Sequence, residues 1–122
     1  MNGTVNDDLL AILRLELVAR GGERLTVDAI VDAGFNGFLT LPRSVMDALG
    51  APVFSRGRAI LADGREELFD IHRVTVDWDG QLISVEAEVT GSAALVGTAL
   101  FENCNLHMQV RIGGEFTITK SN

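Results

Sequence analysis

The position of one aspartate in this sequence, Asp32, needs a physical explanation. Asp32 follows the apolar run 29–31, and the small residues Ala33 and Gly34 come directly after it. A lone carboxylate beside a core is costly to bury unless it is paired or hydrogen-bonded. Two interpretations are open. Either Asp32 caps backbone amides of a strand-turn-strand, or it is a general acid or base whose partner lies elsewhere.

The other residue types that could carry chemistry form no second constellation. Cys104 is the only cysteine, so no intrachain disulfide can form, which fits a reducing compartment. We interpret it as a small, half-buried apolar residue, because nothing orients Cys104 and His107 as a nucleophile and its base. His72 and His107 lie far apart, with no further Cys or His at ligand spacing. We therefore expect no metal and no cofactor.

Composition limits the class of protein. The 122 residues are 47% apolar, which predicts a single folded domain over residues 1–122. The formal charge of −7, with scattered basic residues, argues against a nucleic-acid partner. No apolar stretch approaches the roughly 20 residues of a membrane span, and the polar, acidic first eight residues show no signal peptide. We expect a cytoplasmic protein with no membrane partner.

Turn signals divide the first half of the chain into short elements. Residues 9–18 and 25–31 predict a β-hairpin around the turn at 21–24, and the second strand runs into Asp32. A further strand is expected at 38–41. Pro42 and Gly50 then bracket a short helix over 43–49.

The second half of the chain is predicted to form further strands. Strands at 53–61 and 68–76 flank the tight turn Ala62-Asp63-Gly64, and another strand follows the turn at 78–81. An apolar step at 95–97 leads to a short helix over 98–102. Alternating strands at 106–112 and 116–118 close the chain. The pattern predicts an all-β domain with one or two short helices.

Three of these elements, in this order and spacing, resemble the retropepsin-like aspartic proteases, especially the small free-standing microbial ones. The elements are Asp32-Ala33-Gly34, the hairpin turn Ala62-Asp63-Gly64 and the step Leu95-Val96-Gly97. The run 34–42 is most similar to the microbial subgroup, and the resemblance extends from the first hairpin to Ile118. It implies a closed β-barrel that works as a homodimer.

The resemblance also implies a role for each residue. Asp32 is catalytic, Ala33 and Gly34 support its loop, and Leu95, Val96 and Gly97 pack behind it. Gly34, Phe35 and the hairpin turn Ala62-Asp63-Gly64 bind a peptide or protein substrate. For Asp63 the alternative is a turn-former in Asp-Gly. Because each chain carries one such turn, two Asp32 carboxylates from two copies would share a proton at a symmetry axis.

Two residues depart from the family pattern. Ala33 lacks the hydroxyl that in the family reaches across to the other subunit, and each lost hydrogen bond is worth about 0.5–1.5 kcal/mol net. Phe35 replaces a small residue, so we expect its bulk to narrow the cleft. The alternative function is therefore a weak or inactive dimer of the same fold that binds extended peptides or partner proteins.

Overall fold

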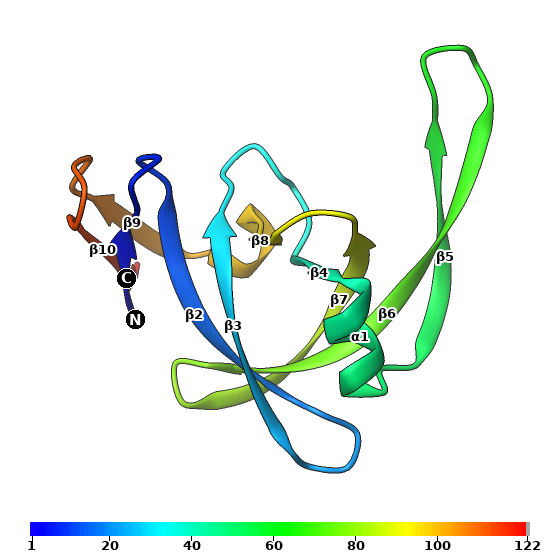
Figure 1. Ribbon diagram of the computed structural model, residues 1–122, viewed down its shortest axis with the longest axis horizontal. Helices are drawn as coiled ribbons and strands as arrows, with labels where there is room; N and C mark the ends of the chain where they lie inside the picture. Colours follow the sequence, from blue (N-terminus) through cyan, green and yellow to red (C-terminus); the bar gives the residue numbers. More distant parts are fainter. Residues whose placement is uncertain (122) are drawn as a thin grey trace.

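Six strands close into a barrel in the structure, a computed structural model that describes residues 1–121 (Figure 1). The ring runs in the order β2-β6-β7-β4-β8-β3 and returns to β2 through a β2–β6 pairing. The barrel strands are β2 (Ala11–Val18), β3 (Arg24–Val31), β4 (Leu39–Pro42), β6 (Glu66–Trp78), β7 (Gln81–Thr90) and β8 (Ala94–Val96). The all-β fold class with short helices is confirmed.

The alternation of β2 shows how the sequence makes this barrel. Leu13, Leu15 and Leu17 are fully buried, whereas Arg14 and Glu16 between them are exposed. Successive side chains of a strand point to opposite faces, so one face fills the core and the other meets water. The predicted β2–β3 hairpin is confirmed.

Arg24 reinforces the seam at which the barrel closes. Glu16 of β2 lies opposite Asp77 of β6, and the Arg24 Nη1 atom lies 3.1 Å from Glu16 Oε2 and 2.9 Å from Asp77 Oδ2. The hydrogen bond to Asp77, followed by the charge of Glu16, raises the pKa of Arg24 above its usual value. The guanidinium therefore links three strands on the outside of the barrel.

Helix α1 (Arg43–Leu49) has the predicted bounds. Gly50 follows it with φ 61°, and its N–H donates to the Asp47 carbonyl at 3.1 Å. This left-handed C-terminal residue is the usual role of glycine at a helix end. Met46 and Leu49 are buried, so the helix covers the end of β4.

Strand β5 (Val53–Ile60) pairs only with the first part of β6, from Glu66 to His72. The two strands form a hairpin, drawn in green, that extends beyond the barrel (Figure 1). Most of its side chains are exposed. The hairpin is therefore supported mainly by its own ladder and by its base on the barrel.

A side sheet continues the barrel in the order β2-β1-β10-β9. Its strands are β1 (Asn2–Val5), β9 (Cys104–Met108) and β10 (Glu115–Lys120), and the predicted helix at 98–102 is the 3₁₀ helix η1 (Thr98–Phe101). The sequence analysis did not predict strand β1, because only Val5 of its four residues is buried.

The predicted strand at 106–112 is too long, because the observed strand β9 ends at Met108. Residues Val110 and Ile112 alternate in sequence, yet both are 66% exposed. The chain instead loops toward β1, where Gly113 N donates to the Val5 carbonyl and Val5 N donates to the Gly114 carbonyl, each at 2.9 Å. Two hydrogen bonds to β1 thus override the alternation.

Candidate active site

The loop that follows β3 fixes the Asp32 carboxylate. Asp32 N donates to the Val96 carbonyl at 2.9 Å, and Asp32 Oδ1 accepts the Gly34 N–H at 2.9 Å. The carboxylate therefore caps the turn, as the simpler interpretation expected. Asp32 is half-buried, while Ala33 and Gly34 are exposed. In the single chain this loop consequently presents a held carboxylate at the surface rather than deep in the core.

Strand β8 lies directly behind this loop. It pairs in parallel with β3 and antiparallel with β4, so its residues Leu95 and Val96 stand between the two strands that enter and leave the loop. Gly97 N donates to the Phe38 carbonyl at 3.0 Å, and Thr98 N donates to the Phe35 carbonyl at 2.8 Å. These bonds hold the far side of the loop to the chain that follows β8.

The Phe35 ring packs against the loop that carries it. A Cβ placed on Gly37 would lie 2.6 Å from Phe35 Cζ, and one placed on Gly97 would lie 2.7 Å from Phe35 Cδ2. The ring therefore covers both glycines. A Cβ on Gly97 would also collide with the Gly37 carbonyl oxygen, so only glycine fits at position 97. The role of Phe35 toward a substrate stays a prediction.

The tip of the β5–β6 hairpin is a tight turn. Gly64 has φ 86°, and its N–H donates to the Leu61 carbonyl at 2.9 Å. The Asp63 carboxylate is directed at Arg65, with Oδ1 accepting the Arg65 N–H at 3.1 Å and Oδ2 2.6 Å from Nε. Ala62, Asp63 and Gly64 are exposed. The hairpin and the loop after β3 project from the same end of the barrel (Figure 1).

Comparison with known proteins identifies the fold of this chain. No protein-family model matches the chain, and a search of curated proteins gives no significant match. Among solved structures, a retropepsin-like aspartic protease from Rickettsia conorii superposes with a TM-score of 0.66 over 99% of this chain and 91% of its own, at 15% sequence identity. The chain has the retropepsin-like fold.

A second solved structure agrees. The protease of Simian Foamy Virus (mac) superposes with a TM-score of 0.55 over 74% of this chain and 92% of its own, again at 15% identity. The lower coverage of this chain reflects the smaller viral protein. At this level of identity the likeness establishes the retropepsin-like fold alone, and the site has to be argued from the residues of this chain.

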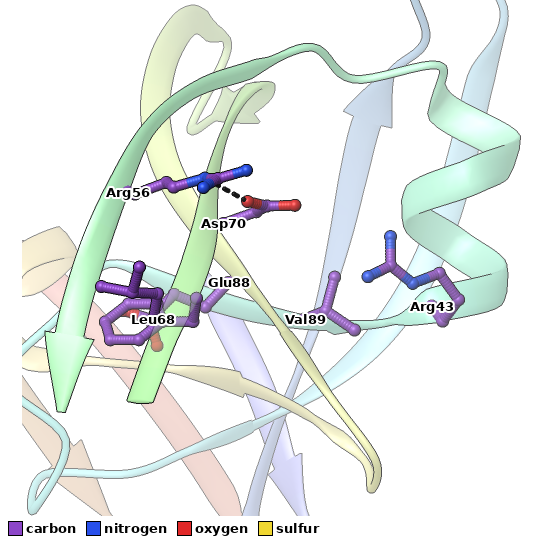
Figure 2. Close-up of a pocket in the computed structure, with 7 residues that line it drawn as sticks. Arg43, Arg56, Leu68, Asp70, Glu88 and Val89 are labelled. Atoms are coloured by element: carbon purple, nitrogen blue, oxygen red, sulfur yellow. Dashed lines mark ion pairs between the residues drawn. The ribbon is translucent and has the colours of Figure 1, made fainter. Parts of the chain in front are cut away.

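A cavity of about 600 Å³ opens where the hairpin leaves the retropepsin-like barrel. Figure 2 shows Arg56 and Asp70, ladder partners on the hairpin, paired at 3.4 Å on one side of it, with Arg43 of α1 on the other side. Its lining is Arg43, Arg56, Leu68, Phe69, Asp70, Glu88 and Val89. None of these was predicted as a site residue, because they come from four separate elements and share no local motif. The cavity combines both charges with apolar groups, which suits a side chain rather than a metal.

A second, apolar groove of about 270 Å³ lies beside the Asp32 loop. It is lined by Leu9, Leu10, Ala11, Val31, Ala33, Leu106, Met108 and Phe116. The sequence connects only Val31 and Ala33, the neighbours of Asp32, with the site. Leu9 and Leu10 come from the β1–β2 turn, Ala11 from the start of β2, and the remaining three residues from the side sheet, which no turn signal connected with Asp32.

Other reactive groups do not converge on the loop. Within residues 1–121 no group of three His, Cys, Asp or Glu side chains could hold a metal ion. The buried His72 ring lies with Nδ1 3.0 Å from the Ala51 carbonyl oxygen, at the base of the hairpin. No helix in the described part of the chain is long and apolar enough to cross a membrane.

Proposed function

We propose that this chain is an aspartic endopeptidase whose active site contains Asp32 from each of two copies. The observation that carries the proposal is the loop geometry within a retropepsin-like fold. Asp32 stands between β3 and β4, its backbone is bonded to β8, and its Oδ1 atom is held by the Gly34 N–H. One carboxylate in this place is half of the pair that the chemistry needs.

The reaction would divide its two proton transfers between the carboxylates. The ionised Asp32 takes a proton from a water molecule, which attacks the peptide carbonyl carbon, while the protonated Asp32 donates its proton to the carbonyl oxygen. The resulting diol then collapses: one carboxyl group donates a proton to the amide nitrogen, the other takes a proton from a diol hydroxyl, and the C–N bond breaks to release the amine and the acid. Two like charges about 3 Å apart do not both ionise readily, so the pair titrates as a unit. The Gly34 N–H fixes the carboxylate direction, and the Gly34 carbonyl would accept a hydrogen bond from the substrate backbone.

The β5–β6 hairpin supplies the other half of a peptide site. It stands free of the barrel at the end where Asp32 lies (Figure 1), with Ala62, Asp63 and Gly64 at its tip. An extended peptide between the loop and the hairpin would be held by backbone hydrogen bonds on both sides. The single cysteine, Cys104, is free, and we retain a reducing, cytoplasmic location as part of this proposal.

Replacing Asp32 by asparagine tests the proposal. Loss of general acid-base catalysis alone lowers a rate by about 10²–10⁴-fold, so Asp32→Asn should show no measurable digestion of a peptide library between about pH 4 and pH 7. The association state should not change, because asparagine has the same shape. Asp28→Asn is the control, since Asp28 lies on β3, the strand that leads into the Asp32 loop, but pairs with Arg14 in solvent. Cleavage retained by Asp32→Asn contradicts the proposal.

Ala33 favours a second candidate, a dimer that binds extended peptides without cutting them. The family hydroxyl that would tie the two loops together is absent at this position. Ala33→Thr separates the candidates, because cleavage that rises in this variant assigns the weakness to the missing hydroxyl. If neither form cleaves any peptide or binds a statine inhibitor, while a peptide still binds, the second candidate is correct.

A further inference from the structure

Glu88 is a carboxylate without a partner at the cavity where the hairpin leaves the barrel. The other three charged residues that line this cavity form ion pairs, with Arg56 Nε 3.4 Å from Asp70 Oδ1 and Arg43 Nη1 3.8 Å from Asp47 Oδ1. Within residues 1–121 the half-buried Glu88 side chain forms neither an ion pair nor a hydrogen bond. Partial burial of an unpaired carboxylate is unfavourable, and no contact in the described part of the chain offsets this cost.

The register of the barrel strands places Glu88 on the same face as Asp32. Glu88 of β7 lies opposite Thr40 of β4. Thr40 lies opposite Leu95 of β8, which in turn lies opposite Ile30 of β3. Because directly opposite residues point to the same face of a sheet, these four side chains share one face. Asp32 follows Ile30 by two residues and its N–H is still bonded to β8, so its carboxylate lies on that face as well.

The row from Ile30 to Glu88 has the length of a short peptide. It crosses three strand spacings of about 4.7–4.9 Å, so the two residues lie at most roughly 14 Å apart. An extended peptide advances about 3.3 Å per residue, and this distance therefore corresponds to about four residues. A peptide whose cleaved bond lies at Asp32 would thus bring a side chain within about four positions of that bond to Glu88.

Two apolar side chains stand beside the Glu88 carboxylate. Ile71 of β6 lies directly opposite Glu88, and Phe69, two residues earlier on the same face, lines the cavity with Glu88. The Phe69 ring lies over Gly57 across the hairpin ladder, because a Cβ on Gly57 would collide with it. Figure 2 shows Glu88 on the hairpin side of the cavity, with Arg43 on the other side. A long aliphatic stem with a cationic head fits apolar groups that lead to a free carboxylate.

We infer that Glu88 is a specificity-determining residue that selects a lysine or arginine side chain in the substrate. The stem of this side chain packs on Phe69 and Ile71, and its cationic head supplies the partner that Glu88 lacks. An acidic side chain in the same place is repelled. The formal charge of −7 attracts cationic peptides over a longer range. The inference rests on the proposed function, because it follows the path of a peptide cleaved at Asp32.

Matched peptides test the inference through cleavage. The bonds cleaved in a peptide library are mapped by mass spectrometry, and lysine or arginine should be enriched at one position within about four residues of the bond. A peptide with lysine at that position is then compared with one that carries acetyl-lysine, which lacks the charge. The wild type should cleave the lysine peptide with a kcat/KM at least about tenfold higher. Glu88→Gln should lower this ratio to below about threefold.

Glu86→Gln is the matched control. Glu86 is exposed two residues earlier on β7, opposite Arg73, and its substitution changes the net charge of the chain by the same amount. The preference of this variant for lysine should equal that of the wild type. If no position prefers a basic residue, or if Glu88→Gln keeps the wild-type ratio, the inference is overturned.

Peptide binding separates a failure of the inference from a failure of the proposed function. Fluorescence anisotropy measures the affinity of Asp32→Asn, with and without Glu88→Gln, for peptides in which one lysine or acetyl-lysine is moved along a neutral sequence. If cleavage depends on Asp32 but lysine and acetyl-lysine are treated alike, the inference fails and the proposed function stands. If nothing is cleaved but tighter binding of lysine peptides depends on Glu88, the proposed function fails and the selection of a basic side chain stands. If peptides are neither cleaved nor bound, both are refuted.

Discussion

At the scale of single residues, the direction of the Asp32 carboxylate depends on close backbone contacts that do not tolerate an added side chain. Gly34 N holds Oδ1, and Gly97 allows the chain after β8 to pass directly beneath the loop. A side chain at position 97 would meet the carbonyl oxygens of Gly37 and Phe35. Backbone atoms of a closed loop cannot move aside as a flexible side chain can.

Gly97→Ala should therefore damage both stability and the site. We expect the free energy of unfolding to fall by about 1–3 kcal/mol, the usual range for overpacking, and peptide cleavage to fall more than the folded fraction does. Gly91→Ala is the control, since a Cβ there meets nothing within 4 Å. Chemical denaturation measures the difference. Equal stability of the two variants would show that the loop can relax away from β8.

At the scale of elements, the β5–β6 hairpin is the part of the molecule most available to a ligand. Ile60 is 76% exposed, and Leu68 lies on the same side of the hairpin ladder and lines the cavity at its stem. Neither side chain contributes to the core. In the proposed function, a bound peptide would cover these two apolar groups of the projecting hairpin.

The double variant Ile60→Ser with Leu68→Ser should raise KM for a peptide substrate. Covering an exposed aliphatic side chain is worth about 1.5 kcal/mol, so losing part of two such contacts should raise KM roughly tenfold. The thermal unfolding midpoint should not change, because both residues are exposed in the free chain. Leu82→Ser serves as the control, since Leu82 is 56% exposed near the start of β7, outside the hairpin. An unchanged KM would remove the hairpin from substrate binding.

The elements that the sequence predicted are those with strong local signals. The hairpin turns and helix α1, between Pro42 and Gly50, needed only nearby residues to define them. Strand β1 was not predicted because its order depends on pairing with β10, more than a hundred positions away. The end of β9 at Met108 was missed for the same reason, since the loop after it bonds to Val5. Likewise Asp32 was found from its own neighbours, whereas the groove beside it assembles residues from distant strands.

At the scale of the whole molecule, net charge opposes the proposed dimer. Each copy carries a formal charge of −7 at pH 7, so two copies repel each other over a distance set by the ionic strength. The Debye length falls from about 10 Å at 0.1 M salt to about 3 Å at 1 M. Salt does not weaken an apolar contact between the copies. Any effect of a high salt concentration on such a contact is to strengthen it.

Added salt should therefore lower the dimer dissociation constant. Sedimentation velocity at low and high sodium chloride concentration measures this directly, and cleavage at limiting protein concentration should rise in parallel. A dimer that dissociates as salt increases would show that ion pairs hold it together and would contradict this prediction.

Mixing active and inactive subunits tests the central claim most directly. Wild-type chain is equilibrated with increasing amounts of Asp32→Asn, and subunit exchange is confirmed with a mass tag. If each active site needs Asp32 from two copies, cleavage per wild-type chain falls with the wild-type fraction and reaches about half in an equal mixture. If cleavage per wild-type chain does not change as Asp32→Asn is added, one chain suffices for activity and the account is contradicted.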